Sequence, residues 1–197
     1  MQYESWLRML VWTNYRLAVL FGVVIPLGLF LWAFIQKAEA IQRLLATYWR
    51  VSSLLAIAVY LMIAQLPIGF LAGFGALLLI PIALWFWVDL NEEIDDRRGR
   101  LKLAFVSWRW AMTIYCTLVA LLQLPFLRCA FAPGAIATPG CQVWLEAPFL
   151  FKQIFHANTK MGTLGFLAVV ALTIYVLSLL YFVFVKLGKQ GRSATGY

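Results

Sequence analysis

Four stretches of this sequence are apolar and free of charged residues over unusual lengths. They are residues 17–35, 51–88, 110–127 and 162–185. A helix needs about 20 apolar residues to cross the hydrocarbon core of a bilayer, so three of the stretches predict one crossing each. The stretch 51–88 is long enough for two. The sequence therefore predicts five membrane-spanning helices.

The turn inside the longest stretch is expected near Pro67, because this proline and three nearby glycines interrupt the helical pattern. The glycines are Gly69, Gly73 and Gly75. We accordingly place the two spans at 51–69 and 71–88. The alternative is a bundle of four spans with one re-entrant or tilted segment.

Composition predicts a single integral membrane domain over residues 1–197. Hydrophobic residues make up 64% of the chain and charged residues 12%, against about half and about a quarter in soluble domains. The expected fold class is all-α, a polytopic bundle of five spans with short interfacial amphipathic helices. A cleaved secretory signal at 17–35 is rejected, because the run exceeds a typical signal core and Lys37, Arg43 and Arg50 follow it.

Basic residues are distributed unevenly between the two sides that five spans define. Of the 16 Lys and Arg residues, five fall on the side of the N-terminus. The other eleven are Lys37, Arg43, Arg50, Arg97, Arg98, Arg100, Lys102, Arg109, Lys186, Lys189 and Arg192. Because basic loops stay in the cytoplasm, we expect the N-terminus outside and the C-terminus in the cytoplasm.

The predicted external loop, 128–161, contains two cysteines on either side of a turn with Pro133 and Gly134. We expect a disulfide between Cys129 and Cys141, which an oxidising compartment permits; two free thiols are the alternative. The spacing is not that of a zinc site, and no third ligand lies near in sequence. No metal site is predicted.

Three segments outside the spans have apolar residues at helical spacing. The stripes are Tyr3, Trp6, Leu7, Leu10 and Val11; Ile41, Leu44, Leu45 and Tyr48; and, after a helix start at Pro148, Phe151, Ile154 and Phe155. Such helices lie flat in the membrane interface or dock against a larger partner, and the sequence leaves both interpretations open.

Five of the eight acidic residues fall within one short run, followed at once by arginines. The residues are Asp89, Glu92, Glu93, Asp95, Asp96, Arg97, Arg98 and Arg100. A solvated surface of mixed charge that docks a partner is the favoured interpretation. The alternative is a carboxylate cluster that holds Mg²⁺ for an enzyme acting on a lipid-borne diphosphate, although no second acidic cluster exists to share the metal.

His156 is the only histidine, which excludes ligation of haem by two histidines of this chain. A single imidazole could ligate the magnesium of a chlorophyll, with an interfacial polar role as the alternative. Chlorophyll or carotenoid is thus the only cofactor class considered, and no catalytic residue is predicted. A small uncoupled carrier or channel would use Gln65 and Gln123 among the few polar residues of the spans.

Three stretches resemble a known family. They are 6–20 (WLRMLVWTNYRLAVL), 85–94 (WFWVDLNEEI) and 187–196 (LGKQGRSATG). The whole chain is similar to an uncharacterised family of small integral membrane proteins of cyanobacteria, a domain of unknown function. The resemblance implies a photosynthetic membrane, with the cysteines in the thylakoid lumen or periplasm.

The leading functional hypothesis is a non-enzymatic protein of the thylakoid or plasma membrane. It would assist a larger, photosynthetic membrane complex as an assembly factor or accessory subunit. We expect membrane lipid and that complex as partners, and no nucleic acid. The C-terminal tail, 189–196, has little to pack against and is predicted to be mobile and cytoplasmic.

Overall fold

The computed structural model describes residues 2–132, 134–187, 191 and 193, and every regular element in this part of the chain is helical. The α-helices are α1 (Gln2–Val19), α2 (Ile25–Ile35), α3 (Glu39–Ile63), α4 (Ile68–Phe86), α5 (Val88–Asp96), α6 (Arg100–Gln123), α7 (Arg128–Phe131), α8 (Pro139–Phe155) and α9 (Met161–Tyr181). Shorter π or 3-10 segments are η1 (Leu20–Val24), η2 (Leu124–Leu127), η3 (Ala135–Ala137) and η4 (Phe182–Lys186). The predicted all-α class is confirmed.

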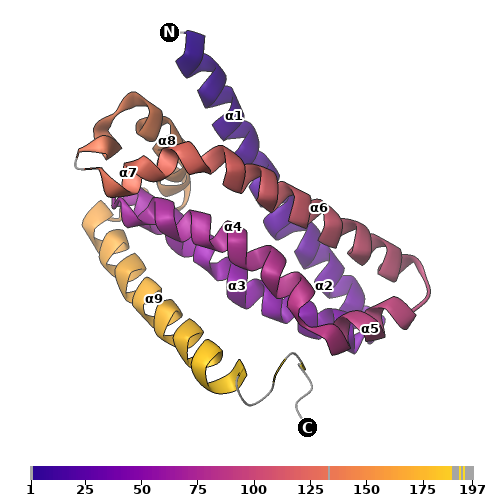
Figure 1. Ribbon diagram of the computed structural model, residues 1–197. Helices are drawn as coiled ribbons and strands as arrows, with labels where there is room; N and C mark the ends of the chain where they lie inside the picture. Colours follow the sequence, from indigo (N-terminus) through magenta and orange to yellow (C-terminus); the bar gives the residue numbers. More distant parts are fainter. Residues whose placement is uncertain (1, 133, 188–190, 192, 194–197) are drawn as a thin grey trace.

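Five helical segments are long and apolar enough to cross a membrane, as the sequence predicts. They are Ser5–Ile35, Glu39–Ile63, Ile68–Phe86, Arg100–Phe131 and Met161–Lys186. Their connections alternate between two ends of an elongated bundle (Figure 1). We call the end with α5 and the α2–α3 turn the α5 end, and the end with α7, α8 and the α3–α4 turn the α8 end. This is the architecture of an integral membrane protein.

The first span contains a π-helical turn, η1, just before Pro26. Proline has no backbone N–H, so carbonyl groups one turn earlier lose their helical donor. Side chains from other helices supply donors instead: Tyr48 Oη donates to the carbonyl of Gly22 at 2.7 Å. Trp108 Nε1 donates to the carbonyl of Phe21 at 2.9 Å. These two bonds fix the bend in the first span to α3 and α6.

Helices α3 and α4 form a hairpin whose turn is residues 64–67, with Gln65 at a φ of +56°. Pro67, near which the turn is expected, lies in it, whereas Gly69, Gly73 and Gly75 lie inside α4 and do not interrupt the helix. They serve close packing: a Cβ at Gly69 would lie 3.1 Å from the backbone nitrogen of Met62. Gln65 consequently lies in the turn and not within a span.

The apolar stripe of residues 41–48 does not form a separate interfacial helix. It is the first part of α3, and Ile41, Leu44, Leu45 and Tyr48 are completely buried in the main core. Lipid anchoring by this stripe is thus a wrong interpretation. Helical spacing shows that one face is apolar, but it does not show whether a protein helix or a lipid tail covers that face.

The other two stripes also differ from expectation. In α1, Leu7 and Val11 are buried against residues of α8, while Trp6 is 53% exposed. Helix α8 begins at Pro139, so Pro148 lies inside it and not at its first position. Within the last turn of α8, Ile154 and Phe155 remain exposed, as a lipid-facing or docking stripe requires.

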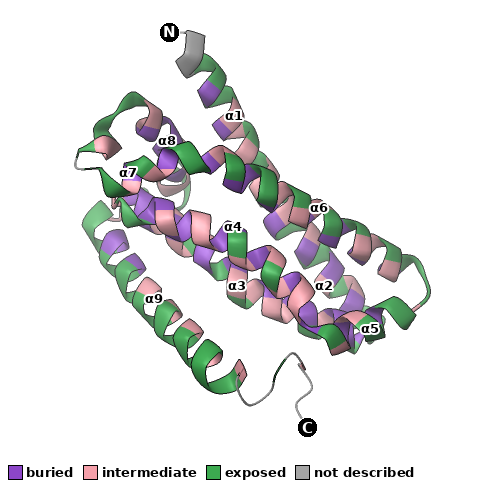
Figure 2. Ribbon diagram, viewed as in Figure 1, coloured by how far each residue is buried: buried purple, intermediate pink, exposed green. Residues whose placement is uncertain are grey.

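Helix α9 packs against the bundle along one face only (Figures 1 and 2). Leu164, Gly165 and Ala168 are its buried residues, and a Cβ at Gly165 would lie only 2.6 Å from the Cβ of Ala64. Its other faces carry large exposed apolar side chains such as Phe166. Large apolar residues suit contact with lipid, whereas helix contacts in membranes favour small ones.

Candidate functional site

The predicted acidic run forms α5, a short helix at the α5 end of the bundle (Figure 1). Leu90 and Ile94 are its buried residues and join the main core. Glu92, Glu93 and Asp96 are exposed, and none of them belongs to an ion pair among the described residues. We call these three side chains the acidic face of α5. It is a set of unneutralised carboxylates on a helix that is packed into the protein.

Helix α5 is held in place by a buried cation on α6. The Arg109 side chain is 3% exposed, and its guanidinium donates a hydrogen bond to Asn91 Oδ1. The guanidinium also lies 4.0 Å from a carboxylate oxygen of Asp95 and 4.1 Å from the ring centroid of Trp85. From the sequence, Arg109 was counted only as one of the eleven basic residues on the side opposite the N-terminus. In the structure it is the centre of the α5–α6 contact.

Two further charged residues of the run, Arg97 and Asp89, make local contacts. Arg97 donates to the carbonyl of Lys37 at 3.4 Å, which joins the end of α5 to the α2–α3 turn. Ser193 donates to an Asp89 carboxylate oxygen at 3.2 Å. Arg98 and Arg100 are exposed. The predicted mobile tail, 189–196, lies largely outside the described residues.

The arrangement of the acidic residues bears on the magnesium-enzyme alternative. Within the part of the chain that the structure describes, no three His, Cys, Asp or Glu side chains are grouped closely enough to hold a metal ion. Asp95 is directed to Arg109, whereas Glu92, Glu93 and Asp96 are spread over the exposed side of one helix. The carboxylates of the run therefore do not converge on a common point.

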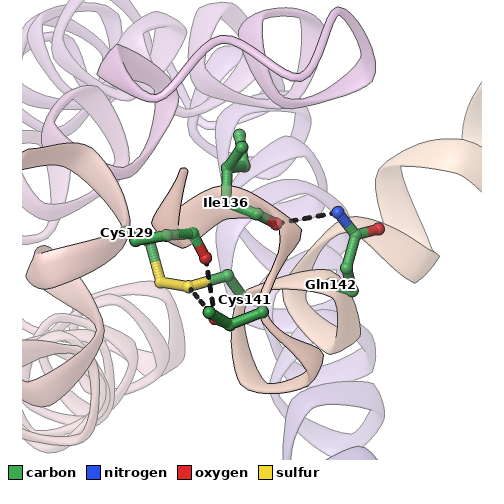
Figure 3. The surroundings of a disulfide bond; sticks show 6 residues. Cys129, Ile136, Cys141 and Gln142 are labelled. Atoms are coloured by element: carbon green, nitrogen blue, oxygen red, sulfur yellow. Dashed lines mark hydrogen bonds between the residues drawn. A yellow bond between two sulfur atoms is a disulfide. The ribbon is translucent and has the colours of Figure 1, made fainter. Parts of the chain in front are cut away.

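At the α8 end, Cys129 and Cys141 form a disulfide with their Cα atoms 6.0 Å apart (Figure 3). The loop that it closes is also fixed by hydrogen bonds: Gln142 Nε2 donates to the carbonyl of Ile136 at 2.8 Å. Thr138 Oγ1 donates to the carbonyl of Ala135 at 2.7 Å. The disulfide thus joins α7 to the first turn of α8.

Helix α8 is also attached to α1 by polar contacts that the sequence analysis did not predict. Glu146 accepts hydrogen bonds from Arg8 Nε at 2.9 Å and from Trp12 Nε1 at 3.1 Å. Tyr15 Oη donates to the carbonyl of Trp144 at 3.1 Å. These contacts make α8 a packed part of the bundle.

His156 lies at the end of α8 and is engaged with α3. Its Nε2 lies 2.8 Å from the hydroxyl of Tyr60, and its ring contacts those of Tyr60 and Phe151. The nitrogen that would ligate a chlorophyll magnesium most directly already has a partner. This geometry favours an interfacial polar role over the pigment-ligand interpretation.

A cavity of about 460 Å³ lies among the first span, α3, α4 and α6. Most of its lining is apolar, with Asn14, Ser52, Tyr115 and Gln123 among the polar contributors. Gln123 lines this cavity, as the carrier hypothesis requires. Gln65 lies in the α3–α4 turn and does not line it. The two glutamines do not share a path.

The comparisons with known proteins give one family. The family model described as "Protein of unknown function (DUF3177)" matches residues 8–195, nearly the whole chain. No curated protein and no solved structure matches the chain significantly. The description of the family names no activity, so no site residue is assigned by similarity.

Proposed function

The chain belongs to the DUF3177 family, and we propose that it is a non-enzymatic accessory subunit or assembly factor of a larger membrane protein complex. The acidic face of α5 carries this proposal. Its three carboxylates are exposed, yet the helix that bears them is fixed to the core through Leu90, Ile94 and Arg109. A charged surface held in one geometry is suited to recognising a complementary surface.

The chemistry of other membrane proteins indicates what the acidic face would meet. Their cytoplasmic loops are rich in Lys and Arg, because of the same rule that orients this chain. The five-span assignment of the sequence puts eleven of its own 16 basic residues on the side that contains residues 89–96, so we infer that this side is cytoplasmic. Carboxylates there are repelled by anionic lipid headgroups but attracted to the basic loops of a neighbouring protein.

The setting that we propose is the thylakoid or plasma membrane of a photosynthetic organism. The resemblance of residues 6–20, 85–94 and 187–196 supports it. The N-terminus would then lie in the lumen or periplasm, where the bond between Cys129 and Cys141 can persist. The partner would be a photosynthetic complex, and bound chlorophyll or carotenoid would accompany that complex.

The test is purification of the tagged full chain in mild detergent, followed by mass spectrometry and an absorption spectrum of the eluate. We expect stoichiometric subunits of one membrane complex. In the triple variant Glu92→Gln, Glu93→Gln, Asp96→Asn their recovery should fall about tenfold, which corresponds to the loss of roughly 1.4 kcal/mol of complementary electrostatics.

The matched control is Glu39→Gln. Glu39 is an exposed carboxylate at the same end but lies on α3, paired with Arg43 at 3.3 Å. This variant should retain the partner. Recovery of the lone protein from the wild type, or equal recovery of partner subunits with the triple variant, would contradict the proposal.

A further inference from the structure

The cavity within the bundle opens sideways, toward the position of the lipid tails. Its floor is formed by buried residues of α4 and α6, including Gly73 and Met112. Its rim is formed by exposed residues on two helical segments, including Val23 of η1 and Ala56 of α3. A molecule dissolved in the bilayer can therefore enter between the first span and α3 without crossing water.

The dimensions of the cavity fit one hydrocarbon chain. Its lining along α3 runs from Trp49 to Met62, a helical distance of roughly 20 Å at 1.5 Å per residue. A volume of about 460 Å³ over that length gives a mean cross-section of roughly 23 Å². The cavity is therefore long and narrow enough to hold one extended hydrocarbon chain.

One buried polar side chain in the cavity wall has unmet hydrogen-bonding capacity. Gln123 is 3% exposed; its Nε2 donates to the carbonyl of Phe70 at 3.2 Å, and its Oε1 has no partner among the described residues. This oxygen is an acceptor. Leaving such a group unpaired inside a membrane protein is costly.

Gln123 lines the cavity and is the last residue of α6, so it lies at the α8 end (Figure 1). Toward the other end of the cavity, the hydroxyl of Ser52 already donates to the carbonyl of Trp49. The unmet capacity is therefore concentrated at one end of a narrow apolar channel.

We propose that this cavity binds a single linear lipid chain that ends in a hydroxyl group at the α8 end. A hydroxyl can donate one hydrogen bond, so it can pair with Gln123 Oε1. A carbonyl or an ether oxygen can only accept. Isoprenoid alcohols and straight-chain alcohols share this chemistry. The proposal does not depend on the accessory role, because it involves neither α5 nor a protein partner.

The experiment uses the full chain, purified and delipidated in detergent, with binding measured by native mass spectrometry. The probes are geranylgeraniol and oleyl alcohol, each compared with its own methyl ether. We expect one alcohol per chain, with the ether bound about tenfold more weakly because it cannot donate to Gln123. In Gln123→Leu, alcohol and ether should bind equally. The tighter of the two alcohols identifies the source of the chain.

A second variant tests the position of the site. Ala56→Phe places a large side chain at the rim and should abolish binding of both alcohols. Gly28→Phe is the control, because Gly28 is exposed and has no atom within 4 Å of an added Cβ. Equal binding of alcohol and ether by the wild type, or unchanged binding by Ala56→Phe, would overturn the proposal.

Discussion

The two ends of the bundle hold a short helix in different ways. At the α8 end, α8 is attached by a disulfide and by an ion pair in which the Arg8 side chain is 57% exposed. At the α5 end, α5 depends on Arg109, which is 3% exposed and bonded to Asn91. Several partly independent polar contacts tolerate the loss of one, whereas Arg109 is the one buried polar anchor of α5 among the described residues, beside the apolar contacts of Leu90 and Ile94. The acidic face of α5 is therefore the more vulnerable of the two structures.

Of the variants proposed to test this contrast, Arg109→Ala should lower the free energy of unfolding most. The variant loses the charged hydrogen bond to Asn91 and the contact with the face of Trp85, together worth roughly 4 kcal/mol of unfolding free energy. Hydrogen exchange should accelerate in residues 88–96 and remain unchanged in α8. The measurement is hydrogen exchange by mass spectrometry, together with denaturant unfolding in mixed micelles.

The control for this prediction is Arg100→Ala, which removes an exposed arginine at the same end. Surface substitutions of this kind usually change stability by less than about 0.5 kcal/mol. If both arginine variants behaved alike, α5 would not depend on the buried cation. Lys is expected to be a poor substitute at position 109, because it lacks the planar fork that stacks on Trp85 and bonds Asn91 at once.

The sequence contains a signal for Arg109 that a count of charges does not detect. Arg109 stands between Trp108 and Trp110, ten residues into α6, where an uncompensated charge in a span is costly. Its partners come from α4 and α5, and the angle at which α5 returns over α6 is not encoded by local spacing. Position along the helix thus predicts that Arg109 needs a partner, but only the fold identifies Asn91.

Loss of the disulfide should have the second largest effect, at the other end. In the double variant Cys129→Ser, Cys141→Ser, the closed loop of about 12 residues is released, which should cost about 2–3 kcal/mol of unfolding free energy. Exchange should accelerate in α7 and the first turn of α8, while 88–96 stays protected. Unfolding in mixed micelles with and without a reducing agent provides the measurement.

Reduction should destabilise the wild type and have no effect on the double variant. Cys116→Ala provides the matched control, because Cys116 is a buried free thiol on α6 and its loss leaves the disulfide intact. The response of this control to reduction should equal that of the wild type. A double variant as stable as the wild type would show that the polar contacts of α8 suffice without the disulfide.

The five spans were predictable because the cost of unpaired backbone groups in lipid leaves long apolar runs few alternatives to helices. The sequence did not predict which helix or lipid surface each apolar face would contact. The stripes at 41–48 and in α1 have the same spacing, yet the first is buried in the core of the bundle, whereas the second divides between α8 and the surface. The cavity was also unpredictable, since it depends on how the first span diverges from α3 and not on any motif.

The smallest predicted effect is that of Glu146→Gln, at the ion pair of the α8 end. Arg8 is 57% exposed and Glu146 30% exposed, so water and salt screen their attraction and the loss should be about 0.5 kcal/mol. Gln retains an acceptor for Trp12 Nε1, which limits the loss to the charge itself. The difference between variant and wild type should vanish at about 1 M salt, where the screening length is about 3 Å.

Unfolding in mixed micelles at low and high salt checks this, and Glu39→Gln, which breaks an exposed pair on α3, should behave similarly. A loss above about 2 kcal/mol that persists at high salt would mean that Glu146 acts as a buried anchor like Arg109, and the contrast between the two ends would no longer hold.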